Sequence, residues 1–266
     1  MFFFKEVCMD KYEKVYDAIT HDQTWKDWMD VIYENPTDDP KLYADHGLCH
    51  AQRVVEYGRK FLTDYFYCQP YDYKKELGLF SIAAALHDIG YAKKNHEGHA
   101  KLSAEIADKY LEQFHDITAK ERDVITHAIR HHSNGVDPDN ILDAALILAD
   151  KMDVVGYRYS NPKCNDDRKI GNMIREQHKV ARVAFKFIEP LFSKNAEFKC
   201  YQTARLSYKL TPAMFEYNEP YNAKCLAEWP KALIVPRNIA LGICKCKNFE
   251  FEVNDVLVDA DAIIPR

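Results

Sequence analysis

The chain has 266 residues, of which 47 % are hydrophobic and 29 % charged, and its formal net charge is −5. This length and composition are typical of a globular protein with one large domain, or with one domain and a small appendage. The sequence contains no block of Lys and Arg that would predict a nucleic-acid surface, and it contains no apolar run long enough to predict a membrane span. The N-terminal residues do not resemble a signal peptide and the eight cysteines are scattered, so we expect a cytoplasmic protein with reduced thiols.

The larger, N-terminal part of the chain has the apolar periodicity of helices, interrupted by Pro, Gly and polar residues. The expected helices, in chain order, are two short ones within about residues 8–34, followed by about 47–68, 73–89, 99–115, 119–132, 138–157 and 168–193. Thr118 and either Pro138 or Asp139 are the expected start signals of two of them. Gly90 is expected to terminate the helix before it.

From Phe198 onward, Thr, Val, Tyr and Ile dominate, and Pro and Asn separate short segments that resemble strands. The expected strands lie in FKCYQTARLSYKL, KALIVPRNIALGICKCKN and FEFEVNDVLVDADAIIP. Cys244 and Cys246 fall in the second segment, where alternation would place both on one face of a sheet in a structural role. The predicted fold class is therefore mainly α, with a helical domain over residues 1–195 and a small β-rich C-terminal segment over residues 196–266, whose role is unassigned.

Histidine is concentrated in one part of the chain, because nine of the eleven lie between positions 46 and 132. His46, His50 and Arg53 would share one helix face at i, i+4 and i+7. His87 and Asp88 end an apolar run, in ALHDIG. Such an adjacent pair at a helix end can turn toward a single point.

Further candidates lie on later helices, where His127, His131 and His132 precede Asp150 and Asp153. An ionised carboxylate is normally buried only when it is paired or bound to a metal. Imidazole and carboxylate ligands together suit a divalent transition metal such as Mn, Fe, Co, Ni or Zn. The pattern therefore predicts a metal site built from several helices.

The ordered set His50, His87-Asp88 and Asp150 resembles the signature of the HD superfamily of metal-dependent phosphohydrolases. DHGLCHAQRV is similar to the first motif of that family, ALHDIG to its defining His-Asp motif, and LADKMD to its last aspartate motif. The resemblance covers about residues 45–155 and implies an HD-domain-like helical bundle.

The resemblance also implies a ligand set. The implied metal ligands are His50, His87, Asp88 and Asp150 for one ion, and His99, His131 and His132 for a second ion that shares Asp88. The cofactor would be one or two divalent transition ions, with Mg possible as well. His46 stands where some members carry a carboxylate ligand, so a third ion stays open.

The helix phase ranks the last three histidines. His132 continues the buried face of Val124, Ile125, Ala128 and Ile129, so it is expected to face the core and the metal. His131 would reach the site only if the helix ends there, and His127 would lie on the flank.

The implied reaction is attack by a metal-activated water on phosphorus, with Asp88, Arg53 and Lys94 as catalytic candidates. The expected partner is a nucleotide or another small phosphoester. Neither a polymeric nucleic acid nor a membrane is expected as a partner, and the sequence does not indicate which oligomeric state the protein has. Two alternatives stay open: a di-iron oxygenase on the same ligands, and a catalytically silent metal-binding or ligand-sensing module.

Overall fold

The structure is a computed structural model that describes residues 10–34, 46–93, 98–133, 137–153, 180–210 and 230–259. Its helices are α1 (Lys11–His21), α2 (Gln23–Glu34), α3 (Leu48–Phe66), α4 (Lys74–Leu86), the 3-10 helix η1 (Ile89–Lys93), α5 (His99–Leu111), α6 (Ala119–His131), α7 (Ile141–Met152) and α10 (Pro230–Leu241). Its strands are β1 (Val180–Phe192), β2 (Phe198–Leu210), β3 (Asn248–Val253) and β4 (Val256–Val258). The predicted fold class, mainly α with a small C-terminal sheet, is confirmed.

Helix α4 is the centre of the helical body. Every residue from Gly78 to Leu86 is buried, and the helix contacts α1, α3, α6 and α7. A helix that is apolar on all sides belongs in the interior rather than at the surface. Helix α3 approaches it closely at Gly58, where an added Cβ would lie 1.9 Å from the ring of Phe80. This packing brings the start of α3 and the end of α4 together.

The expected helix boundaries are confirmed at some ends and wrong at others. Thr118 caps α6, and its side chain and that of Glu121 form a reciprocal capping box. The start signal of α7 is Asn140, next to the expected Asp139. Gly90 does not end α4, which stops at Leu86; Gly90 lies inside η1.

The helix expected over residues 168–193 is wrong where the structure describes it, because residues 180–192 form β1. Arg182 and Lys186 are exposed, whereas Val183 and Phe185 between them are buried, which is the period-two pattern of a strand. Strand β1 pairs antiparallel with β2. The sheet therefore begins before the expected boundary at residue 195, while the division into two domains itself stays a prediction.

The second expected strand is also wrong, because residues 230–241 form α10. Pro236, Ile239 and Ala240 are buried at helical spacing. Strands β2 and β3 are parallel, so their connection must cross over the sheet, and α10 lies within it. Cys244 and Cys246 lie in the turn between α10 and β3, not in a strand, and both are buried free thiols.

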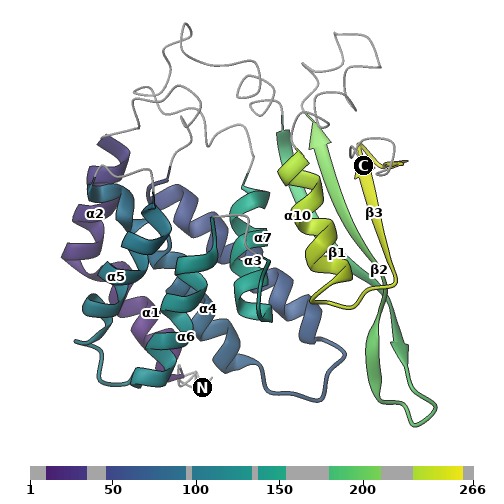
Figure 1. Cartoon of the computed structure of the whole chain (residues 1–266), viewed down its shortest axis with the longest axis horizontal. Helices are drawn as coiled ribbons and strands as arrows, with labels where there is room; N and C mark the ends of the chain where they lie inside the picture. Colours follow the sequence, from purple (N-terminus) through teal and green to yellow (C-terminus); the bar gives the residue numbers. More distant parts are fainter. Residues whose placement is uncertain are drawn as a thin grey trace, which may run out of the picture.

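The sheet has the order β1-β2-β3-β4, and the Asn254-Asp255 turn joins its last two strands. Helix α10 contacts α7 on one side and β3 on the other, and Figure 1 shows it between the helical body and the sheet. Among the described residues, no helix combines the length and apolar character that crossing a membrane requires.

Candidate metal centre

Five helices bring a histidine or an aspartate to one buried region. The contributing residues are His50 on α3, His87 and Asp88 just after α4, His99 at the start of α5, His132 just after α6, and Asp150 on α7. All of them except His99, whose side chain is 14 % exposed, are buried. The structure therefore brings together six of the seven ligands implied by the sequence motifs.

His87 and His132 are held in the same way. Each is the first residue after a helix, and each donates Nδ1–H to the carbonyl oxygen three residues earlier: His87 to Ala84 at 2.8 Å and His132 to Ile129 at 2.6 Å. A hydrogen bond at Nδ1 fixes the tautomer that leaves the Nε2 lone pair for another ligand. Both Nε2 atoms point to the carboxylate of Asp88, each at 3.3 Å from one of its oxygens.

His50 is oriented by a buried carboxylate that the sequence motifs did not single out as a site residue. Its Nδ1 lies 2.6 Å from Oδ2 of Asp153, and Arg53 donates to both oxygens of the same carboxylate at 2.6 and 3.0 Å. His50 and Asp153 are each 0 % exposed. The carboxylate therefore sets the direction of the imidazole, as a carboxylate behind a metal-binding histidine does.

The other nitrogen of His50 lies among potential ligand atoms. Its Nε2 is 3.1 Å from Nε2 of His87, 3.3 Å from Oδ1 of Asp150 and 3.4 Å from Oδ2 of Asp88. Two imidazole nitrogens and two carboxylate oxygens thus face one another across a short gap. This is a donor set that a divalent transition ion binds.

The two oxygens of Asp88 face different partners. Oδ2 lies near His46 (2.6 Å to Nδ1), His50 and His87. Oδ1 lies 3.3 Å from Nε2 of His132 and 3.6 Å from Nε2 of His99. Within the described residues, Oδ1 is buried and accepts no hydrogen bond. A carboxylate placed between two groups of histidines, with one oxygen lacking a hydrogen bond, fits a ligand shared by two ions.

The electrostatics keep Asp88 ionised. Burial by itself would raise the pKa of this carboxyl group, but His87, His46 and His132 around it hold the pKa well below its usual value. An ionised carboxylate is the form that binds cations.

Two further residues belong to this region although neither was among the predicted site residues. The Tyr91 ring stacks between His46 and His99, with ring centroids 4.3 and 4.4 Å away. Lys151 Nζ donates to Oδ2 of Asp150 at 2.5 Å. Tyr91 lies on η1, which begins directly after the His-Asp pair. The only sequence signal for Tyr91 was therefore its closeness to His87 and Asp88 in the chain.

The remaining predicted residues are placed differently. Arg53 donates to both oxygens of Asp153, and its catalytic role stays a prediction. Lys94 lies outside the described residues. His131 belongs to another group of side chains, with His127, Asp139 and Asp143. Neighbouring positions on a helix point about 100° apart, so His131 and His132 diverge at the end of α6.

The expected helix phase is otherwise right. His132, Ile125, Ala128 and Ile129 are buried on the core side of α6, although Val124 is 37 % exposed. The role of each histidine as a metal ligand stays a prediction.

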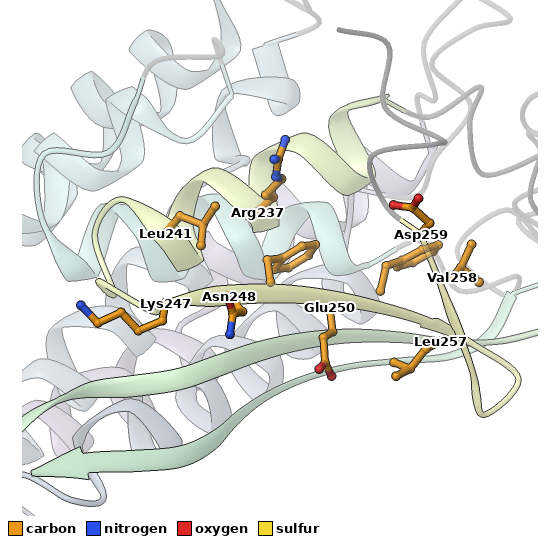
Figure 2. Close-up of a pocket in the computed structure, with 10 residues that line it drawn as sticks. Arg237, Leu241, Lys247, Asn248, Glu250, Leu257, Val258 and Asp259 are labelled. Atoms are coloured by element: carbon orange, nitrogen blue, oxygen red, sulfur yellow. The ribbon is translucent and has the colours of Figure 1, made fainter.

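A cavity of about 360 Å³ lies elsewhere, between α10 and the β3–β4 hairpin. Figure 2 shows Arg237 and Leu241 of α10 on one side of it and Lys247 and Asn248 at the start of β3. None of the residues around Asp88 lines this cavity. The buried donor groups, not the size of this hollow, therefore define the candidate site.

The helical body holds a buried His/Asp cluster that is compatible with divalent metal binding, and a comparison with known families adds to this observation. Residues 47–155 match the family model of the HD domain. This range contains every residue of the cluster except His46. These residues therefore resemble an HD domain, as the motifs suggested. No similar curated protein was found.

Proposed function

We propose that the protein is a metal-dependent phosphohydrolase acting on a nucleotide or another small phosphoester. One observation carries this proposal: the buried Asp88 carboxylate turns one oxygen to His50 and His87 and the other to His99 and His132. HD domains are a superfamily of metal-dependent phosphohydrolases, which supports the same reaction class.

The chain would hold one ion with His50, His87, Asp88 and Asp150, and a second with Asp88, His99 and His132. Bound ions supply Lewis-acid activation of water and neutralise charge on phosphoryl oxygens. The side chains that face outward then contact the substrate. His46 and His99 are each 14 % exposed and Lys151 is 27 % exposed, whereas His50, His87 and His132 are 1 % or less. The substrate therefore approaches from the side of His46, His99 and Lys151.

Lys151 is the cation best placed to bind the phosphoryl group. Its ammonium lies 2.5 Å from Asp150 at the edge of the cluster, and an ammonium is a compact charge whose three donors can hold a phosphate oxygen.

The test is metal analysis of the purified protein, followed by a screen of phosphomonoesters and phosphodiesters with Mn, Co, Ni and Mg. Asp88→Ala should abolish turnover and lower the bound metal, while Asp123→Ala, an exposed aspartate on α6, should change neither. Activity of Asp88→Ala within about tenfold of wild type, or ~1.4 kcal/mol of barrier, would contradict the proposal. Oxygen uptake by iron-loaded protein without phosphoester turnover would support the oxygenase alternative instead.

A further inference from the structure

A second group of potential metal ligands lies on α6 and at the start of α7. It consists of His127, His131, Asp139 and Asp143, each of which offers one ligand atom within 4.8 Å of the others. It shares no residue with the groups around Asp88. Hereafter this group is called the α6–α7 cluster.

The cluster follows from the spacing of its residues. His127 and His131 are one turn apart on α6, so their rings share a face, with centroids 4.1 Å apart at 86°. Asp143 is in the first turn of α7, and Asp139 directly precedes the N-cap Asn140. Two imidazoles from the end of one helix thus meet two carboxylates from the start of the next.

A buried carboxylate and a buried imidazole nitrogen of the cluster bear on cation binding. Asp143 is only 1 % exposed, and its carboxylate accepts from Asn140 Nδ2 at 2.9 Å and from the Asp139 N–H at 3.3 Å. Nδ1 of His131 is buried, and no group in the described ranges hydrogen-bonds to it. A buried imidazole nitrogen without a hydrogen bond is costly unless something else satisfies it. His131 also offers a ligand atom within 4.8 Å of those of His127, Asp139 and Asp143.

The distances within the cluster are longer than those of a tight ion pair. His127 Nδ1 lies 3.2 Å from each oxygen of Asp143, and its Nε2 lies 3.4 Å from Asp139. Charge-assisted hydrogen bonds are typically about 2.7–2.9 Å long. In the same molecule His46 and His50 approach their carboxylates to 2.6 Å. Ligand atoms that surround an ion are spaced more widely, because each contacts the ion instead of its neighbour.

We propose that the α6–α7 cluster binds a divalent transition cation, of the zinc class, with two imidazole and two carboxylate ligands. Such a mixed set suits Zn, Co or Ni better than Mg or Ca, which prefer oxygen ligands alone. The ion joins the last turn of α6 to the first turn of α7. His132 directly follows α6 and Asp150 lies on α7, so the site braces two elements that reach the Asp88 region. This inference does not depend on the proposed function.

The test measures zinc binding in a protein whose Asp88 region is disabled. In a His87→Ala/Asp88→Ala background, Asp139→Ala should weaken zinc binding at least about tenfold, since even the loss of an outer-shell partner costs about that much. Asp137→Ala is the matched control, because it removes an exposed aspartate two residues away that is outside the cluster. Asp139 is itself 68 % exposed, so its removal should leave folding intact. Equilibrium dialysis gives the affinities, and the melting temperature with and without zinc gives a second readout.

Equal zinc affinity in the Asp139→Ala and Asp137→Ala proteins would overturn the proposal, and would leave an ion-pair network around His127 instead. If the background variant does not fold, zinc-soaked crystals of the wild-type protein decide. An anomalous peak about 2.0–2.2 Å from the His127 and Asp143 ligand atoms supports the site. A peak near Asp88 with none at the α6–α7 cluster rejects it.

Discussion

At the scale of single residues, the orientation of the candidate ligands depends on atoms behind them. His87 and His132 use backbone carbonyls, whereas His50 uses the carboxylate of Asp153. Asp153 also accepts both hydrogen bonds from Arg53, so one buried carboxylate satisfies two donors. Removing the Asp153 carboxylate would take this buried partner away from both the guanidinium of Arg53 and the imidazole of His50.

We therefore expect Asp153→Ala to lower the free energy of unfolding by about 3–5 kcal/mol, the usual cost of removing one partner of a buried ion pair. Metal affinity should fall by about 10–100-fold as His50 loses its orientation. Urea denaturation and metal titration measure the two effects, with exposed Asp123→Ala as the control. Lower stability with unchanged metal affinity would show that Asp153 supports the fold but does not position His50.

At the scale of elements, short contacts between helices set the distances within the cluster. Gly90 of η1 packs against the start of α5, and its N–H donates to Ser103 Oγ at 2.9 Å. A Cβ at this position would lie 2.5 Å from the carbonyl oxygen of His99. The glycine is therefore needed for close approach.

Gly90→Ala should push the start of α5 away and carry His99 with it. We expect a destabilisation of about 1–3 kcal/mol, as for other overpacked interiors, and weaker binding of the ion that uses His99 than of the ion that uses His50. Stepwise metal titration separates the two ions. Lys93→Ala, an exposed change in the same 3-10 helix, is the control. An equal loss of metal affinity at both titration steps would mean that Gly90→Ala disturbs the whole fold and not the start of α5 alone.

Glu121 ties α1 to the start of α6. It accepts from Tyr12 at 2.5 Å and from Lys11 at 3.2 Å, and it closes the capping box with Thr118. Burial would raise the pKa of Glu121, but these hydrogen bonds outweigh it and lower the pKa to about 2.

A carboxyl group whose pKa is lower in the folded state stabilises the fold above its unfolded pKa and loses that contribution as the pH falls. Between about pH 4.5 and pH 2, wild-type stability should therefore decline more steeply than that of Glu121→Gln. Urea denaturation at several pH values gives the two slopes. Parallel curves for the two proteins would contradict the lowered pKa.

At the scale of the whole molecule, the sheet and the helical body share one core. Phe185 and Phe187 of β1 lie 5.6 and 5.5 Å, centroid to centroid, from Phe61 of α3. Tyr201 of β2 donates to the carbonyl oxygen of Asp64 at 2.6 Å. The contact of Tyr201 crosses the expected domain boundary at residue 195.

Wild-type protein should accordingly unfold in a single transition, with calorimetric and van't Hoff enthalpies in agreement. Phe185→Ala should lower the free energy of unfolding by about 3–5 kcal/mol. Phe192→Ala on the same strand, which is 50 % exposed, should have little effect. Two separate transitions would instead mean that the C-terminal part folds independently.

The sequence by itself determined the helical class of the described residues between 10 and 153 and the candidate residues His50, His87, Asp88 and Asp150. Helical periodicity and motif order are local properties, and the structure brings these four side chains together. It also predicted correctly that His132 faces the core, because that follows from the phase of a single helix.

Only the tertiary structure decided the rest. Strand β1 was expected as a helix, because its pairing with β2 and its burial against Phe61 are not visible in a short window. Arg53 was expected as a catalytic residue, and the structure adds its contact with Asp153, which directly follows α7. His131 was grouped with His132, yet it lies with Asp143 of α7 and with Asp139, which precedes that helix. Each outcome depends on which distant element faces a residue, and local spacing carries no such information.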